Sequence, residues 1–253
     1  MSRASRVRGF VAPSIALVIY LALAAYPPIW EAVLGRMFPG ESRLLYQQAG
    51  MLTLIGQHAT MVGISSLASA IIGISLGVFV TRPVGADFHD TVADLANLGQ
   101  TFPPIAVLTL AVPLLGFGFE PTVFALTLYG VLPVLQNTIA GIRSIPAAIT
   151  ESARGMGMTP AQVLFRAELP AAAGVIFAGV RVSVVVNVAT AAIGAAIGAG
   201  GLGVPIISGL VNYDPAVTLQ GGVLAAVLAL ILDAYLGAAQ RGFVRTAQLG
   251  TIT

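Results

Sequence analysis

Long apolar runs separated by short polar stretches are the dominant pattern of this chain. A helix that crosses a bilayer needs about 20 mostly apolar residues, and six runs meet that length. They cover approximately residues 10–29, 59–80, 95–117, 121–142, 171–199 and 216–239. The pattern predicts an all-α, polytopic membrane protein with about six transmembrane helices.

The first apolar run follows three arginines within the first eight residues, a pattern typical of a segment whose N-terminus stays in the cytoplasm. A cleaved signal peptide is the alternative, because Ala22-Leu23-Ala24 loosely resembles a signal-peptidase site. The run continues to Pro27-Pro28, however, and the rest of the chain is itself membrane-like. We therefore expect the run to be a span, followed by an external loop over residues 30–57.

Composition supports a membrane protein and excludes several classes of function. The chain is 57% hydrophobic and 9% charged, with a mean hydropathy of +0.93, whereas soluble domains are about 45–50% apolar and about 25% charged. The net charge of +2 is dispersed and gives no footprint for nucleic acid. Without cysteine there is no disulfide, thiolate metal site or cysteine nucleophile, and we expect no cofactor.

The arginines indicate how the chain is oriented. If the N-terminus is cytoplasmic, the six runs place nine arginines inside, and these are Arg3, Arg6, Arg8, Arg82, Arg143, Arg154, Arg166, Arg241 and Arg245. Arg36 and Arg43 then lie outside, and Arg181 falls within the fifth run. Because cytoplasmic loops carry an excess of basic residues, this bias predicts that both termini are cytoplasmic.

Small residues recur at every fourth position of the second and fifth runs. The two series are Ser65, Ser69, Gly73 and Gly77, and Ala191, Ala195 and Ala199. Such ridges let helix backbones approach closely in lipid. They indicate either packing within one subunit, or a subunit interface or moving pathway wall.

A polar insertion over residues 143–170 separates the fourth run from the fifth. Pro146 suits the first turn of a short helix, and Gly155 or Gly157 can supply the left-handed residue that ends it. Thr159-Pro160-Ala161-Gln162 then forms a capping-box pattern that starts a second helix. We expect that helix to end just before Pro170, because a residue that precedes proline disfavours helical backbone.

This insertion also carries apolar side chains that are expected to be accessible to solvent. They are Met156, Met158, Val163, Leu164 and Phe165. An exposed apolar surface usually has a partner, and methionines adapt to a partner that changes shape.

The insertion resembles a known signature. Glu151-Ser152-Ala153, then Gly157, then Leu169-Pro170 are similar to the EAA motif of permease subunits of binding-protein-dependent ABC importers. The family's motif is Glu-Ala-Ala, three residues, Gly, nine residues, Ile, one residue, Leu-Pro. This chain departs from it at Ser152 and at Ala167, where Ala and Ile are usual. Both changes are small or apolar.

The resemblance implies a role for the whole insertion as the coupling element that docks on a cytoplasmic ATPase. The residues that carry this role over are Glu151, Ser152, Ala153, Gly157, Ala167, Leu169 and Pro170. Gly157 is expected to form a sharp turn. For Glu151 a solvated helix charge paired with Arg154 is the alternative. The chain as a whole, residues 1–253, is expected to be one transmembrane domain with a permease core at about 57–245.

A second resemblance concerns the solute. Residues 73–77, 81–83, 151–160, 164–170 and 197–203 are together similar to permeases for glycine betaine, choline and related osmoprotectants. Methionine and phosphonate permeases share parts of the pattern, so an importer of another small solute, such as an amino acid, stays open. The resemblance implies two copies of an ATPase that binds ATP, a second permease that is identical or paralogous, and an external substrate-binding protein. Together with membrane lipid, these are the expected partners in the cell's inner membrane.

Other functions fit the sequence less well. A secondary transporter driven by an ion gradient is expected to show internal repeats and acidic residues at the membrane midplane, which are hard to find here. A membrane-embedded enzyme lacks an evident catalytic set, since His58 and His89 fit no metal-ligand spacing and activate no obvious serine. Residues 198–203 match G-x-G-x-x-G, but without the strand that a dinucleotide site requires.

Polar and ionisable residues within spans are functional candidates. Arg181 and Asp233 are expected at similar depth in the fifth and sixth spans, so we predict a structural ion pair between them. Asn187 either lines a pathway or forms a hydrogen bond between helices.

Overall fold

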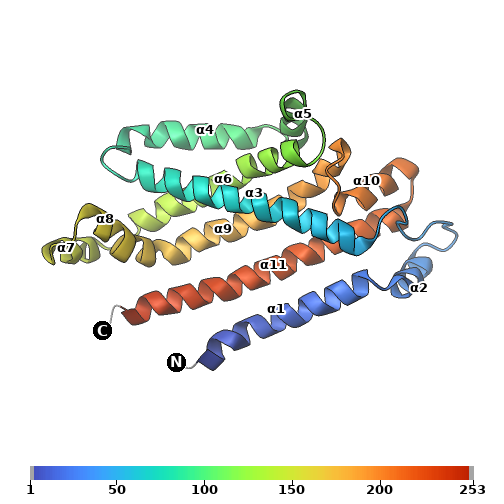
Figure 1. Ribbon diagram of the computed structural model, residues 1–253, viewed down its shortest axis with the longest axis horizontal. Coiled ribbons are helices and arrows are strands. Elements are labelled where there is room, and N and C mark those ends of the chain that lie inside the picture. The colour runs from blue at the N-terminus through green and yellow to red at the C-terminus, as the bar shows by residue number, and fades with distance from the viewer. Residues whose placement is uncertain (1–2, 251–253) are drawn as a thin grey trace. The chain divides into compact units, whose positions relative to one another are not determined.

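The protein is helical throughout the part that the structure describes. The computed structural model describes the backbone of residues 3–250, and the side chains within residues 9–98 and 101–241, and it contains no strand there (Figure 1). The all-α prediction is thereby confirmed. The side chains of Arg3, Arg6, Arg8 and Arg245, which entered the argument on orientation, lie outside the described residues.

Figure 1 labels the helices in chain order. The N-terminal half contains α1 (Arg3–Ala24), α2 (Pro27–Met37), α3 (Met51–Val80), the 3₁₀ turn η1 (Ala86–Phe88), α4 (His89–Thr101), α5 (Pro104–Leu115) and α6 (Phe119–Arg143). The C-terminal half contains α7 (Ala147–Gly155), α8 (Pro160–Val163), the π turn η2 (Leu164–Glu168), α9 (Leu169–Ala191), the 3₁₀ turn η3 (Ala192–Ile197), α10 (Gly203–Asn212) and α11 (Pro215–Gly250).

Four helical segments in the described residues are long and apolar enough to span a membrane. They are Met51–Val80, Phe119–Arg143, Pro160–Ile197 and Pro215–Arg241. The helices α1 and α2 meet at a bend of 77° and qualify as a fifth span only when taken together. The structure therefore offers four or five long spans where the apolar runs predicted six.

The predicted third span, residues 95–117, is wrong as a single helix. Two short helices, α4 and α5, take its place, with Phe102 and Pro103 between them. Pro103 has the extended angles φ −59° and ψ 139°, and Pro104 begins α5. A residue before proline disfavours the helical region, and proline itself suits the first helical position, so the Pro103-Pro104 pair interrupts the run.

The N-terminal boundaries also differ from the prediction. The first apolar run is interrupted at Tyr26, where α1 has ended and Pro27 starts α2. The predicted loop over residues 30–57 is shorter than expected, because α2 continues to Met37 and α3 already begins at Met51. Apolar content set the expected length of the run, but proline decided where its helix ends.

By the packing of its residues the chain divides into two compact units. The first unit contains the residues up to Ser66 together with Phe102–Thr127 and Val184–Tyr235. The second contains Leu67–Thr101, Leu128–Ser183 and the residues from Leu236.

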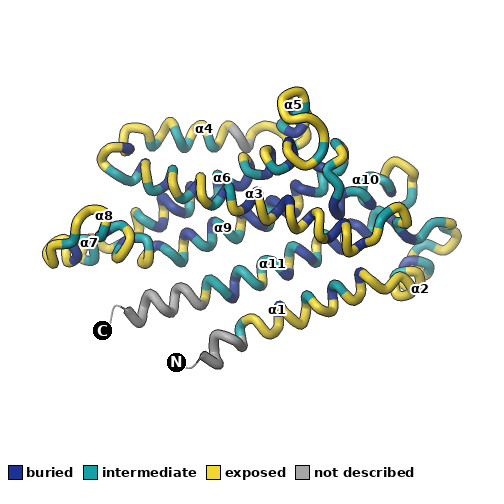
Figure 2. Tube along the Cα trace, viewed as in Figure 1, coloured by how far each residue is buried: buried dark blue, intermediate teal, exposed yellow. Residues whose placement is uncertain are grey.

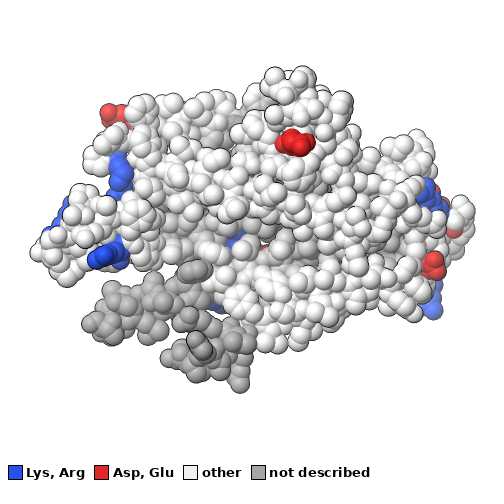
Figure 3. Space-filling model, viewed as in Figure 1, with Lys and Arg blue, Asp and Glu red and all other residues white. Residues whose placement is uncertain are grey.

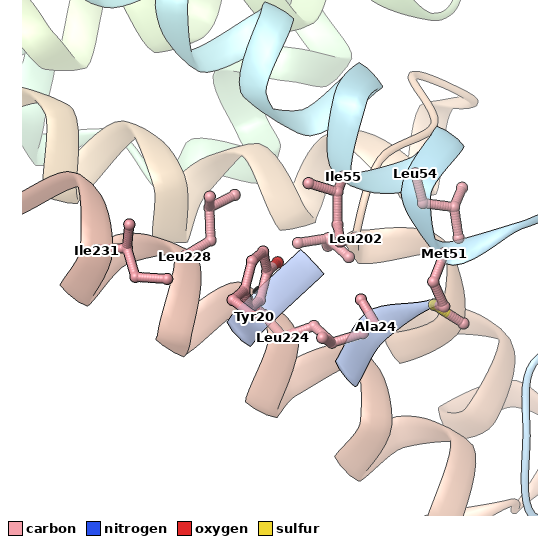
Figure 4. Close-up of a cluster of buried hydrophobic side chains, with 9 residues drawn as sticks. All are labelled: Tyr20, Ala24, Met51, Leu54, Ile55, Leu202, Leu224, Leu228 and Ile231. Atoms are coloured by element: carbon pink, nitrogen blue, oxygen red, sulfur yellow. Dashed lines mark hydrogen bonds between the residues drawn. The ribbon is translucent and has the colours of Figure 1, made fainter. Parts of the chain in front are cut away.

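The core of the first unit joins α1, α3 and α11. Figure 4 shows its nine buried side chains directed toward one another, and they are Tyr20, Ala24, Met51, Leu54, Ile55, Leu202, Leu224, Leu228 and Ile231. Tyr20 is the polar member, and its hydroxyl donates to the Leu224 carbonyl at 3.0 Å. Along the rest of α1, within residues 9–24, most side chains are exposed (Figure 2), including Ile15 and Val18, as expected for a lipid-facing helix.

The core of the second unit packs the end of α3 against α6. Val80, Leu135 and Ile139 form its buried centre. Two of the small residues predicted to form a ridge on the second span, Gly73 and Gly77, lie against Val134 and Thr138 of α6. In this unit the ridge therefore serves helix packing within one chain.

The close approach at Gly73 leads to a prediction about stability. A Cβ built there would lie 2.7 Å from the Val134 Cβ, so Gly73→Ala should force α3 and α6 apart and cost about 1–3 kcal/mol. Gly63→Ala is the matched control, because a Cβ at Gly63 of the same helix meets nothing within 4 Å. Thermal unfolding of the detergent-solubilised protein should show a lower Tm for Gly73→Ala alone, and equal Tm values would contradict this packing.

Candidate functional site

Residues 147–163 form a helix, a sharp turn and a second helix in the second unit. Pro146 precedes α7 with extended angles, φ −56° and ψ 133°. Gly157 has φ +79°, so it is the left-handed residue of the turn, whereas Gly155 remains helical. Two backbone bonds close the turn, from Gly157 N–H to the Arg154 carbonyl at 2.9 Å and from Met158 N–H to the Ala153 carbonyl at 3.2 Å.

The predicted capping box is present at the start of α8. Gln162 N–H donates to the Thr159 hydroxyl at 3.4 Å, and Thr159 N–H donates to the Gln162 Oε1 at 2.9 Å. The two bonds satisfy donors that a helix start leaves without partners. The turn and the cap thus fix the geometry between α7 and α8 from within the segment.

The tip of this segment, here called the exposed turn (residues 155–158), presents an apolar side chain to its surroundings. Met156 is 72% exposed, and Phe165 nearby in the sequence is 67% exposed. A Cβ at Gly157 would meet nothing within 4 Å, so the glycine is required by its backbone angle and not by crowding within this chain. Val163, which was expected on the exposed surface, is buried at 3%.

The residues of the EAA resemblance differ in exposure. Glu151, Ser152, Gly157 and Pro170 are exposed, Ala167 and Leu169 are half-buried, and Ala153 is buried. Both Glu151 and Arg154 are described, and they form no ion pair with each other. Glu151, Ser152 and Gly157 lie in the exposed turn or within a few residues of it, whereas Pro170 lies at the start of α9.

The second helix does not end before Pro170, contrary to the prediction. The chain continues from α8 through the π turn η2 into α9, so that residues 160–197 form one helical segment. In a regular helix the proline ring clashes with the carbonyl four residues earlier. In the π turn, Leu169 N–H donates to the Leu164 carbonyl, five residues earlier and not four. This wider turn relieves the clash at Pro170.

The π turn also determines which residues face inward. The buried positions run Val163, Glu168, Ala172 and Ile176, a first step of five residues followed by steps of four. In an α-helix residues five apart point about 140° away from each other. A π turn brings such residues into line, so Glu168 joins the buried side of the helix.

Glu168 forms an ion pair with Arg82, which follows the end of α3. Arg82 Nη2 lies 2.6 Å from Glu168 Oε2, and the two side chains are 29% and 7% exposed. Arg82, Arg143, Arg154 and Arg166 all belong to the second unit. In Figure 3 blue arginine atoms gather at the end of that unit that carries α7 and α8.

Asn187 forms hydrogen bonds between helices. It is fully buried, and its Nδ2 donates to the hydroxyls of Ser65 at 3.2 Å and Ser66 at 3.0 Å on α3. Of the two roles considered for Asn187, the structure supports helix–helix bonding.

Arg181 and Asp233 belong to different units, so their predicted ion pair stays a prediction. Within the second unit, Arg181 Nη1 donates to Gln240 Oε1 at 2.9 Å. Gln240 Nε2 in turn donates to the Gly174 carbonyl at 2.7 Å. The guanidinium thereby connects α9 to α11.

In the first unit, Gln57 and His58 of α3 hold the backbone around Gly201 and Leu202 by hydrogen bonds. This arrangement, here called the polar clasp, was not predicted from the sequence. His58 of α3 is fully buried, and its Nδ1 accepts the Leu202 N–H at 3.3 Å while its Nε2 lies 3.0 Å from the Val188 carbonyl. This arrangement suits a neutral imidazole with its proton on Nε2. The neighbouring Gln57 Oε1 accepts the Gly201 N–H at 2.9 Å.

The clasp holds the glycine-rich segment 198–203, in which three glycines have positive φ. These are Gly198, Gly200 and Gly201. Gly198 ends η3 in the left-handed region, so the G-x-G-x-x-G pattern closes a helix, as predicted, and no strand precedes it. The residues that hold the segment lie 144 positions away, which is why no local sequence signal could reveal them.

Comparison with known proteins identifies the family of this chain. Its residues 72–245 match the family of the inner membrane component of binding-protein-dependent transport systems. The chain belongs to this family. It is 37% identical over 231 residues to the osmoprotectant import permease protein OsmY of Salmonella typhimurium, covering 91% of this chain and 92% of that protein.

Two further similarities agree with this family. The choline transport system permease protein OpuBB of Bacillus subtilis is 40% identical over 186 residues, which cover 73% of this chain and 84% of OpuBB. Among solved structures, an inward-facing MetNI methionine ABC transporter matches with a TM-score of 0.69 and 25% identity, covering 76% of this chain and 95% of that chain. The protein is thus a permease component in the inner membrane, and the region matched to the family includes α7, α8 and the Arg82–Glu168 pair.

Because His58 belongs to the polar clasp, we expect it to contribute more to the stability of the protein than His89 does. His58→Leu removes the acceptor of a buried N–H and should cost about 1–3 kcal/mol. His89→Leu should change the stability by less than about 0.5 kcal/mol, because His89 pairs only with the exposed Asp90. Thermal unfolding of the two variants side by side measures this difference, and a stable His58→Leu protein would argue against the clasp.

Proposed function

We propose that this chain is the membrane-spanning permease subunit of an ATP-driven importer for a small quaternary-amine osmoprotectant such as glycine betaine or choline. In this proposal the chain hydrolyses no ATP and holds no cofactor. ATP is bound by a separate cytoplasmic ATPase, present in two copies, and the solute is delivered by an external binding protein. A second permease, either a copy of this chain or a paralogue, completes the pathway.

The observation that carries the proposal is the exposed turn on a rigid helical element. Met156 presents apolar surface between α7 and α8, outside the long apolar helices, and Phe165 near the start of the segment Pro160–Ile197 is exposed as well. Exposed apolar surface of this kind is typical of a protein contact. Internal bonds hold the turn, so a partner that moves it also moves the helices on either side. The EAA resemblance assigns that partner as the ATPase.

Transport follows from this geometry by alternating access. Closure of the ATPase dimer on ATP displaces the exposed turn. Because α7 follows α6 after three residues and η2 continues directly into α9, the displacement reaches two long helices through the covalent chain. Reorientation of these helices opens the pathway to one side of the membrane and closes it to the other.

The names of the relatives support the class of solute. OsmY is an osmoprotectant import permease and OpuBB a choline transport permease, and both are more similar to this chain than the methionine transporter is. For orientation, we propose that both termini and the exposed turn are cytoplasmic, in agreement with the nine arginines that the positive-inside rule assigns to that side.

Affinity purification from gently solubilised native membranes tests the partners. The tagged chain should bring down an ATPase subunit, and the co-eluting permease will show whether the pair is identical or mixed. Proteoliposomes containing the purified complex and its binding protein should then take up labelled choline or glycine betaine only when ATP is supplied on the side of the membrane that carries the ATPase. Uptake driven by an ion gradient without ATP would instead establish a secondary transporter, and uptake of methionine alone would establish an amino-acid importer.

The exposed turn gives a sharper prediction. Gly157→Asp adds a Cβ at a φ of +79°, a conformation that costs most side chains about 1–2 kcal/mol, and places a charge at the proposed docking surface. We expect normal membrane insertion and at least about a tenfold loss of transport per ATP hydrolysed, which corresponds to about 1.4 kcal/mol of coupling.

Gly155→Asp is the matched control for that variant. Gly155 is exposed and helical and has nothing within 4 Å of a built Cβ, so it receives the same charge without the backbone strain. Because Gly155 belongs to the same exposed turn, this control shares the effect of the charge. It should couple better than Gly157→Asp, and the difference measures the contribution of the backbone turn. Wild-type coupling in Gly157→Asp would refute the role assigned to the turn.

A further inference from the structure

The element formed by α7, α8 and η2 is attached to the rest of its unit in two different ways. The covalent chain connects it to α6 and α9. No covalent link joins it to α3, whose neighbourhood it reaches through the Arg82–Glu168 ion pair. Side-chain packing also connects α3 to α6 around Val80 and Leu135, but packed helices can slide past one another.

Arg82 stands in a tight turn that follows α3 directly. Its N–H donates to the Phe79 carbonyl at 3.0 Å, and its carbonyl accepts the Gly85 N–H at 3.0 Å. Arg82 Nη2 also lies 3.4 Å from the Thr81 hydroxyl, which is itself bonded to the Val78 carbonyl at 2.8 Å. The guanidinium is therefore held on the end of α3 and does not sit on a loose loop.

Glu168 is placed by an independent feature of the backbone. The π turn η2 ends at Glu168 and puts it in line with buried Val163 and Ala172. A regular helix would turn this carboxylate by about 140° relative to Val163. π turns are rare in helices overall, and those that occur are often found at functional sites. A π turn and an ion pair that meet at one residue therefore point to a role for that residue.

Burial of Glu168 makes the Arg82–Glu168 ion pair costly to separate. Glu168 is 7% exposed, and a carboxylate that loses its partner in such surroundings would remain buried and uncompensated. Buried pairs add little net stability over apolar side chains, and their better-attested use is to fix register. Exposed pairs such as His89–Asp90, whose carboxylate is 95% exposed, do not fix register in this way.

We propose that the Arg82–Glu168 pair locks the coupling element to the end of α3, so that displacement of the exposed turn moves α3 together with α6 and α9. Both are positioning residues, since they act through the helices that they join. The inference deepens the proposed function and depends on it. Without the pair, the ATPase still docks and hydrolyses ATP, but α3 lags behind and less solute crosses for each ATP consumed.

A charge swap in the full complex tests this proposal. Arg82→Glu and Glu168→Arg should each lower the amount of solute imported per ATP by about tenfold or more, while the ATPase still co-purifies. The double variant restores the pair with reversed polarity and should recover coupling to within about threefold of wild type. Glu168→Gln, which keeps the shape and removes the charge, should resemble the single reversals, whereas Asp90→Asn at the exposed pair should couple as wild type does.

Measurements on the permease alone separate this inference from the proposed function. The Tm of the solubilised chain should fall in each single reversal and recover in the double variant, whether or not any ATPase binds. If the Tm recovers but the import per ATP does not, the pair is structural only and the coupling role is overturned. Single reversals that couple normally overturn it as well, whereas a wild-type complex without ATP-dependent import refutes the proposed function itself.

Discussion

The arrangement of these helices depends on one constraint, namely that a polar group inside lipid must find its partner within the protein. Each buried polar side chain that we describe in detail joins two elements. Tyr20 connects α1 to α11, Asn187 connects α9 to α3, and His58 connects α3 to the glycine-rich segment. Apolar packing alone would distinguish poorly between helix pairs in a solvent as apolar as leucine, so these bonds, together with small residues such as Gly73, fix which helices meet.

The exposed turn is built on the opposite plan. Bonds around Gly157 close its backbone, and the capping box fixes the start of α8 that follows it, yet Met156 in the turn and Phe165 in η2 remain exposed. A segment that is held by its own hydrogen bonds and exposes apolar side chains is suited to bind a partner and to transmit the partner's displacement to the helices attached to it. The Arg82–Glu168 pair joins the end of η2 to the residue next but one after α3, and in our proposal it passes a displacement of the exposed turn on to α3.

Local features of the sequence predicted local structure well. The apolar runs predicted the long helices α3, α6 and α11, and the Thr159 pattern predicted the capping box, because each depends on residues within a few positions of one another. Proline was harder to interpret. Pro103 divided a predicted span, whereas Pro170 was accommodated by a π turn that no residue pattern announced. The clasp of Gln57 and His58 and the Arg82–Glu168 pair join residues far apart in sequence, so only the fold could reveal them. The positions implied by the EAA resemblance remain a hypothesis about a surface whose partner is a separate chain.

The contact between the exposed turn and an ATPase is the central claim, and site-directed cross-linking tests it most directly. Because the chain has no cysteine, Met156→Cys introduces a single thiol at a side chain that is 72% exposed. With a thiol-to-amine cross-linker in native membranes, this variant should form a covalent adduct that contains the ATPase subunit, with a yield that changes when ATP is added. Val211→Cys, at a position 70% exposed on α10, should form no such adduct. Absence of the adduct at Met156, or an equal yield at Val211, would contradict the account.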